Sequence, residues 1–418
     1  MKILIIGKPT YNVILPTANF LVEGSKTLIN EKLDTGGGAS FYVANLFGKW
    51  RTPCFYTGVV GSDIYGNKIK ADLEELGVDI KYLETNYEHP TAMNYILLNN
   101  QNGSSTQIVK DNPEINLVKY KYEFVPDFLI MDGTDMAGSL ANLNNFPRAT
   151  SILFANKVSK DTHALSKKVT YVVANVGFAQ ALAKMELQIG KPKQLVAFLQ
   201  KIRDLNKSEY VIMMREHGVL YSSEREVKMI PAIDIERKVD DTNGGNIFFA
   251  AFCYGIVNGY GIDASVKMAN ISAGLSLTKM GTVDCIPALE DVLKIGYIQK
   301  PGEEEKPEEV KPDGPPPVQL SDTNEEIKPT EITETPVTNQ EVQPVIDGLA
   351  ESIQPVAFAE VAEGAPTPPV ELPATVHEMS TVNAFDAAVA APEMPVPQAQ
   401  IPAEQPPANP TGTGNIFD

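Results

Sequence analysis

Residues 239–252, which read VDDTNGGNIFFAAF, carry the pattern in this chain that is best suited to chemistry. Asn243, Gly244 and Gly245 predict a turn, and the apolar run after them predicts the first turns of a helix. Backbone N–H groups and the helix dipole converge at such a helix N-terminus, so it can bind an anion such as a phosphate group. We expect Val239 and Asp240 to end a strand just before this turn.

The stretch resembles, without a gap, the signature V-D-T-x-G-A-G-D-x-F of the pfkB (ribokinase-like) family of carbohydrate kinases. In that family the last Asp takes the proton from the sugar hydroxyl, and the glycine turn binds the charge that develops on the transferred phosphate. Other segments of residues 1–297 resemble the family too: Gly37-Gly38-Ala39, Val60 to Gly66, Gly77-Val78-Asp79, Asp132-Gly133 and Ala273–Pro287. The resemblance implies an α/β fold, a doubly wound sheet flanked by helices, with a small β lid from residues about 12–33 and 91–110.

Asn246 occupies the position of the catalytic base in this resemblance, and Asn243 occupies that of the first glycine. A neutral amide has no basic lone pair to match a carboxylate, so we do not expect Asn246 to accept a proton from a substrate. Losing a general base typically costs about 10²–10⁴-fold in rate. We therefore interpret Asn243, Gly244 and Gly245 as a phosphate-binding turn that is kept beside a base that is lost.

The sugar-contact positions implied by the resemblance also differ from the family pattern. An Asp that grips sugar hydroxyls in the family is Asn12 here, and its amide can still form a hydrogen bond to a hydroxyl. An Asn that follows the G-G-A segment in the family is Tyr42, which is bulkier and is expected to intrude on a sugar pocket. Gly37 and Gly38 remain beside them as substrate-binding positions.

Two motifs of the nucleotide side have changed as well. The family's N-x-x-E motif, which helps to hold magnesium and phosphate through water, reads Asn175-Val176-Gly177-Phe178 here. A hard cation needs oxygen ligands and a phenyl ring has none, so we expect no metal site. The T-x-G-x-x-G turn near the nucleotide phosphates reads Met213 to Gly218, with Arg215 at a glycine position. Arg215 is either a loss of that turn or a substitute phosphate ligand.

The elements that must position these residues are short apolar strands that alternate with helices. Met1–Gly7 predicts a buried strand, and Asp63–Leu76 predicts a helix with Asp63 as its N-cap. In the second half, apolar strands are separated by helical patterns such as Gly177–Leu187 and Pro192–Leu205. Such alternation predicts a parallel sheet that is covered on both faces.

The composition changes sharply near residue 300. Residues 301–418 contain 21 of the 31 prolines, and 22 acidic residues against three basic ones, so the net charge of −18 belongs to this part of the chain. We divide the chain into a pfkB-like domain, residues 1–297, and a disordered tail, residues 298–418. Apolar islands around Phe358, Phe385 and Phe417 interrupt the tail and are candidate docking motifs for partner proteins.

Other classes of function have little support in the sequence. A near-neutral head and an acidic tail argue against binding to nucleic acid. No segment approaches the ~18 apolar residues of a membrane span. Cys54, Cys253 and Cys285 lie far apart, which suggests buried free thiols in a reducing compartment, and we expect a cytoplasmic protein. The lid implies, by resemblance, a homodimer contact.

Three functions remain open. The first is a pfkB-type protein with impaired catalysis that acts as a binding or scaffolding subunit. The second is an active kinase of a sugar or nucleoside with a rearranged site, which would use ATP and magnesium. The third is a sensor that binds a sugar or nucleotide without turnover. Asn246 and Phe178 together favour the first, because phosphoryl transfer depends on positioning and charge stabilisation.

Overall fold

The computed structural model describes residues 1–18, 22–29, 31–112, 117, 121–205, 207–224, 226–301 and 318–320. All of them belong to one unit of the chain, Met1–Pro329. The expected tail islands at Phe358, Phe385 and Phe417 lie outside the described residues, as does most of the segment that we expect to be disordered. The domain boundary at residue 297 stays a prediction.

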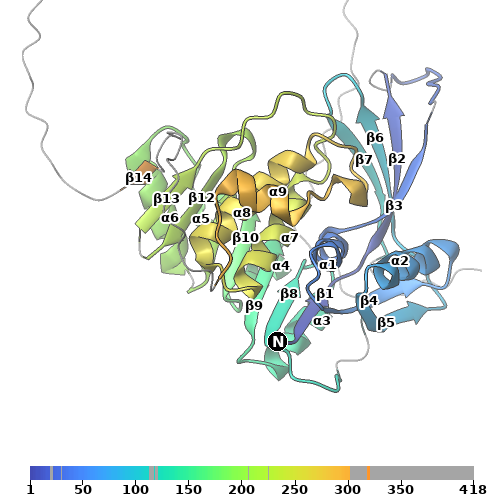
Figure 1. Ribbon diagram of the computed structural model, residues 1–418, viewed down its shortest axis with the longest axis horizontal. Coiled ribbons are helices and arrows are strands. Elements are labelled where there is room, and N and C mark those ends of the chain that lie inside the picture. The colour runs from blue at the N-terminus through green and yellow to red at the C-terminus, as the bar shows by residue number, and fades with distance from the viewer. Residues whose placement is uncertain are drawn as a thin grey trace, which may run out of the picture. The chain divides into compact units, whose positions relative to one another are not determined.

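Seven strands of the main sheet run parallel in the described chain, in the order β11-β10-β9-β8-β1-β4-β5 (Figure 1). The chain builds outward from β1 through β4 to β5, then returns to β8 on the other side of β1 and continues to β11. This reversal makes the sheet doubly wound, as predicted, and places a topological switch point between β1 and β8. The seven strands are β1 (Ile3–Ile6), β4 (Phe55–Gly61), β5 (Asp79–Asn86), β8 (Phe128–Met131), β9 (Thr150–Ala155), β10 (Tyr171–Asn175) and β11 (Glu209–Met213).

The other edge of this sheet is antiparallel, which the alternation of strands and helices did not predict. There β12 (Val219–Ser223), β13 (Glu226–Ile230) and β14 (Val318–Leu320) pair antiparallel to one another, and β12 pairs antiparallel to β11. The links between β11, β12 and β13 are a few residues long, which is too short for the crossover that a parallel pair requires. The sheet is therefore mixed.

Successive side chains of the parallel strands enter two different cores, because a strand turns alternate residues to opposite faces. Ile3 and Ile5 pack in one core, and Leu4 and Ile6 pack in the other; all four are fully buried. The first core also contains apolar side chains of α1, α2, α7, α8 and α9, and the second those of α3 to α6. Both faces of the sheet are thus covered, as the apolar strands predicted.

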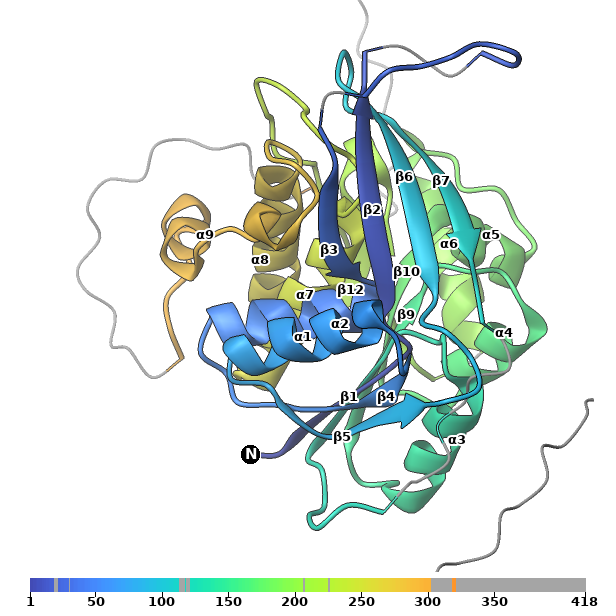
Figure 2. The ribbon, with the colours of Figure 1, turned by 90° about the vertical axis from the view of Figure 1, so that its right-hand side faces the viewer.

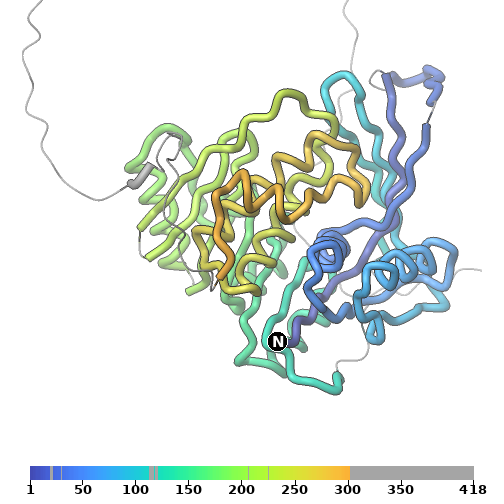
Figure 3. The backbone as a smooth tube through the Cα atoms, in the orientation of Figure 1, coloured from blue at the N-terminus to red at the C-terminus, as the bar shows by residue number. Residues whose placement is uncertain are grey.

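The helices expected at Asp63–Leu76 and Pro192–Leu205 are present, and the one expected at Gly177–Leu187 ends earlier, at Ala183. Figures 2 and 3 show how the chain passes through the helices. Asp63 is the N-cap of its helix and accepts hydrogen bonds from the N–H groups of Tyr65 and Gly66. The helix bounds are α1 (Ala39–Lys49), α2 (Ile64–Glu75), α3 (Met136–Asn145), α4 (Lys160–Ser166), α5 (Val176–Ala183), α6 (Pro192–Leu205), α7 (Gly244–Val257), α8 (Gly261–Ser276) and α9 (Leu289–Gly296), with short 3-10 turns η1 (Arg215–His217) and η2 (Val283–Cys285).

A second sheet of four strands, here called the lid sheet, stands beside the main sheet (Figure 2). Its order is β3-β2-β6-β7; β2, β6 and β7 overlap the segments expected to form a lid, residues 12–33 and 91–110, whereas β3 lies beyond the first of them. One face carries the fully buried side chains of Ile14, Ile96 and Leu98. The strands are β2 (Thr10–Thr17), β3 (Leu33–Gly37), β6 (Met93–Asn99) and β7 (Ser105–Lys110).

The prediction that Val239 and Asp240 end a strand is wrong. The preceding strand, β13, ends at Ile230, and residues 231–243 are irregular. The N–H groups of Val239 and Asp240 both donate to the carbonyl oxygen of Leu277, at the end of α8, and not to a neighbouring strand. The turn before α7 is therefore positioned by α8.

The thiols and the helices of the described chain agree with two further expectations. Cys54, Cys253 and Cys285 are free and buried, and burial raises the pKa of each thiol. None of the helices in the described residues is long and apolar enough to cross a membrane.

Candidate functional site

The N-terminus of α7 is the centre of the predicted site, and its two glycines lie close to neighbouring side chains. A Cβ atom on Gly244 would lie 2.9 Å from a methyl group of Leu277, so a larger residue would displace that side chain. A Cβ atom on Gly245 would lie 3.8 Å from the methyl carbon of Met213 and 3.8 Å from the ring of Phe154. The first N–H groups of an α-helix have no carbonyl partner inside the helix, so this turn keeps the capacity to bind an anion.

Asn246 belongs to a chain of hydrogen bonds between amides. Its Nδ2 donates to Oδ1 of Asn243 over 3.1 Å, and Nδ2 of Asn243 donates to the Gly281 carbonyl oxygen over 2.5 Å and to the Tyr42 hydroxyl over 2.7 Å. A carbonyl oxygen only accepts, so Asn243 must turn its nitrogen toward Gly281 and its oxygen toward Asn246. Asn246 must then act as a donor. The residue in the base position is thus fixed in a role that a carboxylate could not fill.

Tyr42 is fully buried beneath this turn. It lies on α1, and its hydroxyl donates to the Gly281 carbonyl oxygen over 2.8 Å while it accepts from Asn243. Burial raises the pKa of Tyr42 well above its ordinary value, with Cys285 and Asp240 adding to the effect. The phenol therefore stays neutral and holds α1, α7 and the loop after α8 together. A contact of Tyr42 with a substrate stays a prediction.

Asn12, Gly37 and Gly38 come together where the lid sheet joins the main sheet. A Cβ atom on Gly37 would lie 2.3–2.4 Å from the amide atoms of Asn12, so only glycine leaves room for that side chain. Asn12 is buried, and its Oδ1 accepts a hydrogen bond from Thr10 Oγ1. Gly38 has φ of 91°, a conformation that residues with a side chain rarely adopt, and it is the N-cap of α1.

Asn175 and Phe178 are used for local structure. Asn175 is the N-cap of α5: its Oδ1 accepts from the Phe178 N–H over 2.8 Å, and its Nδ2 donates to the Asn156 carbonyl oxygen. The Phe178 ring is 2% exposed and packs in the core between the sheet and α5. In the described part of the chain, no group of three His, Cys, Asp or Glu residues could hold a metal ion. The Phe178 ring offers no oxygen ligand to a hard cation such as magnesium.

Arg215 holds a backbone conformation that suits glycine. Its φ is 54°, in the left-handed region, while its side chain is exposed. Gly218, three residues on, has φ of 90°, and a Cβ atom there would lie 2.0 Å from the Ile230 carbonyl oxygen. The turn thus keeps the backbone path of a glycine turn although its first glycine position carries a charged side chain.

Met213 connects this turn to the other parts of the site. It pairs with Asn175 across β10 and β11, and its methyl group lies beside Gly245. The structure therefore forms two groups of predicted site residues. One group contains Asn175, Met213 and the α7 turn. The other contains Asn12, Gly37 and Gly38. The Met213 side chain next to the start of α7 is apolar, and a methionine donates no hydrogen bond to a phosphate.

Asp132 was named from the sequence only as part of a family-like segment and not as a site residue. It follows β8 at the topological switch point and is 5% exposed. Its carboxylate accepts from the Ser40 N–H at the start of α1 and from the Thr134 N–H. Burial raises its pKa, although the hydrogen bonds from Ser40 and Thr134 oppose this. An Asp placed directly after a buried strand was the available signal.

Two surface pockets of the described chain lie elsewhere. One, of about 490 Å³, lies between the end of α8 and α9 and is lined by residues such as Lys279, Pro287 and Lys294. The other, of about 350 Å³, is lined by residues such as Tyr171, Arg203 and Glu209. Neither is lined by any of the predicted site residues.

Comparison with known proteins agrees with this fold. The model of the family described as pfkB family carbohydrate kinase matches residues 1–289. A ribokinase of Bacillus subtilis is 25% identical over 308 residues, which cover 70% of this chain and 98% of that enzyme. The solved structure of Arabidopsis thaliana ribokinase with ribose and ATP has a TM-score of 0.58 at 17% identity, over 71% of this chain and 99% of that one. Ribokinase from Cryptococcus neoformans with ADP has a TM-score of 0.60 at 17% identity, over 70% and 99%.

Proposed function

The chain belongs to the pfkB family of carbohydrate kinases, and from this premise we propose that it has lost phosphoryl transfer and acts as a binding or scaffolding subunit. The observation that carries the proposal is the chain of amide hydrogen bonds at the start of α7. Asn246 occupies the base position, and Asn243, Tyr42 and Gly281 oblige it to donate a hydrogen bond. The Nδ2 of Asn246 is engaged as a donor, and the oxygen of a neutral amide is too weakly basic to take the proton of a substrate hydroxyl.

The residues that would face ATP and magnesium support the same proposal, because they suit neither well. Relatives have been solved with ATP or ADP, so the family fold accommodates a nucleotide. Here the position whose side chain helps to hold the metal in the family carries Phe178, and its ring is buried in the core. The apolar Met213 adjoins the α7 turn, and Arg215 replaces a glycine in the phosphate turn. Catalysis of phosphoryl transfer is almost wholly positioning and charge stabilisation, so these changes remove most of what it requires.

A second candidate is a sensor that binds a sugar or nucleotide without turnover. It is favoured by the glycines that the site keeps: Gly37 leaves space for the Asn12 amide, and Gly244 and Gly245 begin α7 with unpaired helix N–H groups. A hydrogen bond from Asn12 and an anion site on α7 would be enough to hold a ligand, though not to transform it.

Thermal unfolding of the full chain separates these candidates from an active kinase with a rearranged site. The additions are ATP with magnesium, ATP alone, and a panel of ribose and nucleosides. A ligand present at a hundred times its dissociation constant adds about 2.7 kcal/mol to the free energy of unfolding. No shift with any addition supports the scaffold. A shift with a sugar alone supports the sensor, and a magnesium-dependent shift with ATP would contradict the scaffold and favour an active kinase.

The tail is where we propose that partner proteins bind. Its islands around Phe358, Phe385 and Phe417 repeat short apolar patterns. Several weak contacts on one linker together raise the overall affinity for a partner. Truncation after Phe385, and separately F417A, should each reduce the partners that co-purify with the chain. Unchanged partners in both variants would refute this part of the proposal. We place the protein in the cytoplasm, because its three thiols are free and buried, which suits a reducing compartment.

A further inference from the structure

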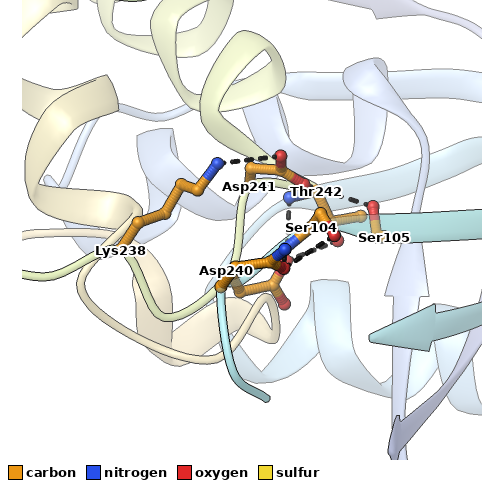
Figure 4. A network of polar contacts seen from close by, with 7 residues as sticks. Ser104, Ser105, Lys238, Asp240, Asp241 and Thr242 are labelled. Atoms are coloured by element: carbon orange, nitrogen blue, oxygen red, sulfur yellow. Dashed lines mark hydrogen bonds and ion pairs between the residues drawn. The ribbon is translucent and has the colours of Figure 1, made fainter. Parts of the chain in front are cut away.

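The hairpin between β6 and β7 rests on the segment that leads into α7. The Asp241 N–H donates to the Gly103 carbonyl oxygen over 2.9 Å, and Ser105 Oγ donates to Asp241 Oδ1 over 3.3 Å. Lys238 forms an ion pair with the other oxygen of Asp241, also at 3.3 Å. Figure 4 shows Lys238 and Ser105 on either side of Asp241. The tip of the lid sheet is thus joined to the α7 turn by a backbone bond as well as by side chains.

Gly103 allows the two backbones to approach this closely. Its φ is 68°, and a Cβ atom there would lie 2.8 Å from the carbonyl carbon of Val239 and 3.0 Å from the carbonyl oxygen of Lys238. These are backbone atoms, which cannot rotate away as the end of a flexible side chain would. Any residue larger than glycine must therefore push the hairpin tip off residues 238–239.

A second contact joins the lid sheet to the loop after α8. Met280 packs against the buried face of the lid sheet, which is formed by Ile14, Ile96 and Leu98. The next residue, Gly281, donates its N–H to Asp240 Oδ2 over 2.8 Å. The two loops that flank the start of α7 are therefore bonded to each other, and each of them also contacts the lid sheet.

We propose that these contacts form a latch, in which Gly103, Asp241 and Met280 hold the lid sheet closed against the α7 turn through the chain's own groups. A ligand approaching that turn from the lid side must first open the latch. Its apparent affinity is then reduced by the fraction of molecules in which the lid sheet is open. The inference concerns access to the turn and does not depend on whether the chain catalyses phosphoryl transfer.

The steric fit and the backbone bond contribute more to this latch than the charges do. The side chains of Lys238 and Asp241 are 41% and 30% exposed, and ion pairs of that kind stabilise little. The Gly103 contact is between backbone atoms, and the Met280 contact is apolar and against fully buried side chains. Removing charge should therefore matter less than adding a Cβ atom at residue 103 or removing the Met280 side chain.

Hydrogen exchange of the full chain tests the latch, followed by mass spectrometry of peptides that cover residues 93–105 and 236–243. G103A should speed exchange in both peptides by about tenfold, as expected when a closing contact is lost. G77A is the matched control: Gly77 has φ of 74°, so it bears the same backbone strain, but nothing lies within 4 Å of its Cβ position. G77A should leave both peptides unchanged.

M280A is a second variant for the hydrogen-exchange experiment, and it leaves the hairpin backbone unchanged. It tests the latch if G103A does not fold. It should speed exchange in residues 93–105, whereas M229A, at a partly buried methionine of β13, should not. Faster exchange in G103A and M280A, with unchanged controls, supports the latch. Exchange in a folded G103A equal to that in G77A overturns the proposal, whatever M280A does. If G103A does not fold, exchange in M280A equal to that in M229A overturns it.

Discussion

Two asparagines at the start of α7 determine what this site can do. Asn243 is positioned by Gly281 and Tyr42, and its orientation sets the role of Asn246. The residue types were readable from the sequence, and so was the loss of a carboxylate. The direction of each hydrogen bond was not, because it depends on the Gly281 carbonyl oxygen and the Tyr42 hydroxyl, which lie 38 and 201 positions away from Asn243 along the chain. The burial of Tyr42 was hidden for the same reason.

The first prediction is that N246D alone lowers the free energy of unfolding. A carboxylate at this position would face the Oδ1 of Asn243, so two acceptors would meet and one would remain unpaired. The free energy of unfolding should fall by about 1–3 kcal/mol at pH 7, the usual cost of an unsatisfied buried polar group. The loss should shrink at acidic pH, where the new carboxyl group is protonated. Urea denaturation at both pH values measures it.

The double variant N243G/N246D provides the control. It removes the opposing oxygen and restores both residues of the family signature, so most of the stability lost in N246D should return. If N246D alone is as stable as the unmodified chain at pH 7, the amide chain does not determine the role of residue 246.

The second prediction concerns Arg215. Left-handed backbone costs a residue with a side chain about 1–2 kcal/mol, and glycine in the unfolded chain has an opposing entropic cost of about 0.5–1 kcal/mol. R215G should therefore raise the free energy of unfolding by about 0.5–1 kcal/mol. R148G, at an exposed arginine of a turn that lacks a positive φ, should give no gain. Equal effects in urea denaturation would show that the turn is not strained.

At the scale of elements, most of the fold could be predicted, because glycines and capping residues mark where elements begin. Asp63 and Gly38 mark the starts of α2 and α1, and apolar runs mark the buried strands. What escaped prediction was the antiparallel edge. The short strand β13 (EVKMI) alternates charged and apolar residues over only four positions, and its role depends on pairing with β12. The irregular course of residues 231–243 likewise depends on hydrogen bonds to α8 and to the lid sheet.

The third prediction uses the cap of α2, which joins that helix to the start of the lid strand β6. Asp63 accepts hydrogen bonds from Gly66, Tyr65 and Thr91. Burial alone would raise its pKa, but the hydrogen bonds from Gly66, Thr91 and Tyr65 outweigh burial and hold the pKa below its ordinary value. D63A should lower the free energy of unfolding by about 1–2 kcal/mol at pH 7.

The pH dependence of D63A follows from that lowered pKa. The folded chain keeps Asp63 ionised at pH values where the unfolded chain binds a proton. The stability that this carboxylate contributes is therefore present above its ordinary pKa of 3.8 and is lost as the pH falls through the folded value. The difference between the unmodified chain and D63A should shrink under acid. D63N, which keeps an acceptor oxygen without charge, should lose less at pH 7. A D63A loss that is independent of pH would refute this account.

At the scale of the whole molecule, the sequence predicted a doubly wound sheet, a lid and an acidic tail. The structure confirms the first, with its switch point between β1 and β8, and three strands of the second sheet overlap the segments expected to form a lid. The latch could not be read from the sequence. Gly103, Asp241 and Met280 lie in three separate segments, and only the folded chain brings them to the start of α7.

The fourth prediction is a homodimer through the lid sheet. Tyr95 and Ile108 pair across β6 and β7 on the face opposite the buried Ile96, and they are 37% and 57% exposed. An apolar pair on an exposed sheet face is suited to a partner surface. Light scattering of the full chain after size-exclusion chromatography should give twice the mass of one chain. I108D should reduce this to the mass of a single chain. A single-chain mass for both proteins would argue against a lid dimer.

The central claim, that this pfkB family member has lost phosphoryl transfer, is tested most directly by its turnover. The full chain would be mixed with ATP, magnesium and a panel of sugars and nucleosides that includes ribose, with the Bacillus subtilis ribokinase as the positive control, and ADP would be measured over time. Kinases commonly turn over at about 1–100 s⁻¹, and we predict a rate at least ~100-fold lower with every compound. Sugar-dependent ADP formation within the usual range would contradict the account, because it would show that Asn246 does not prevent catalysis.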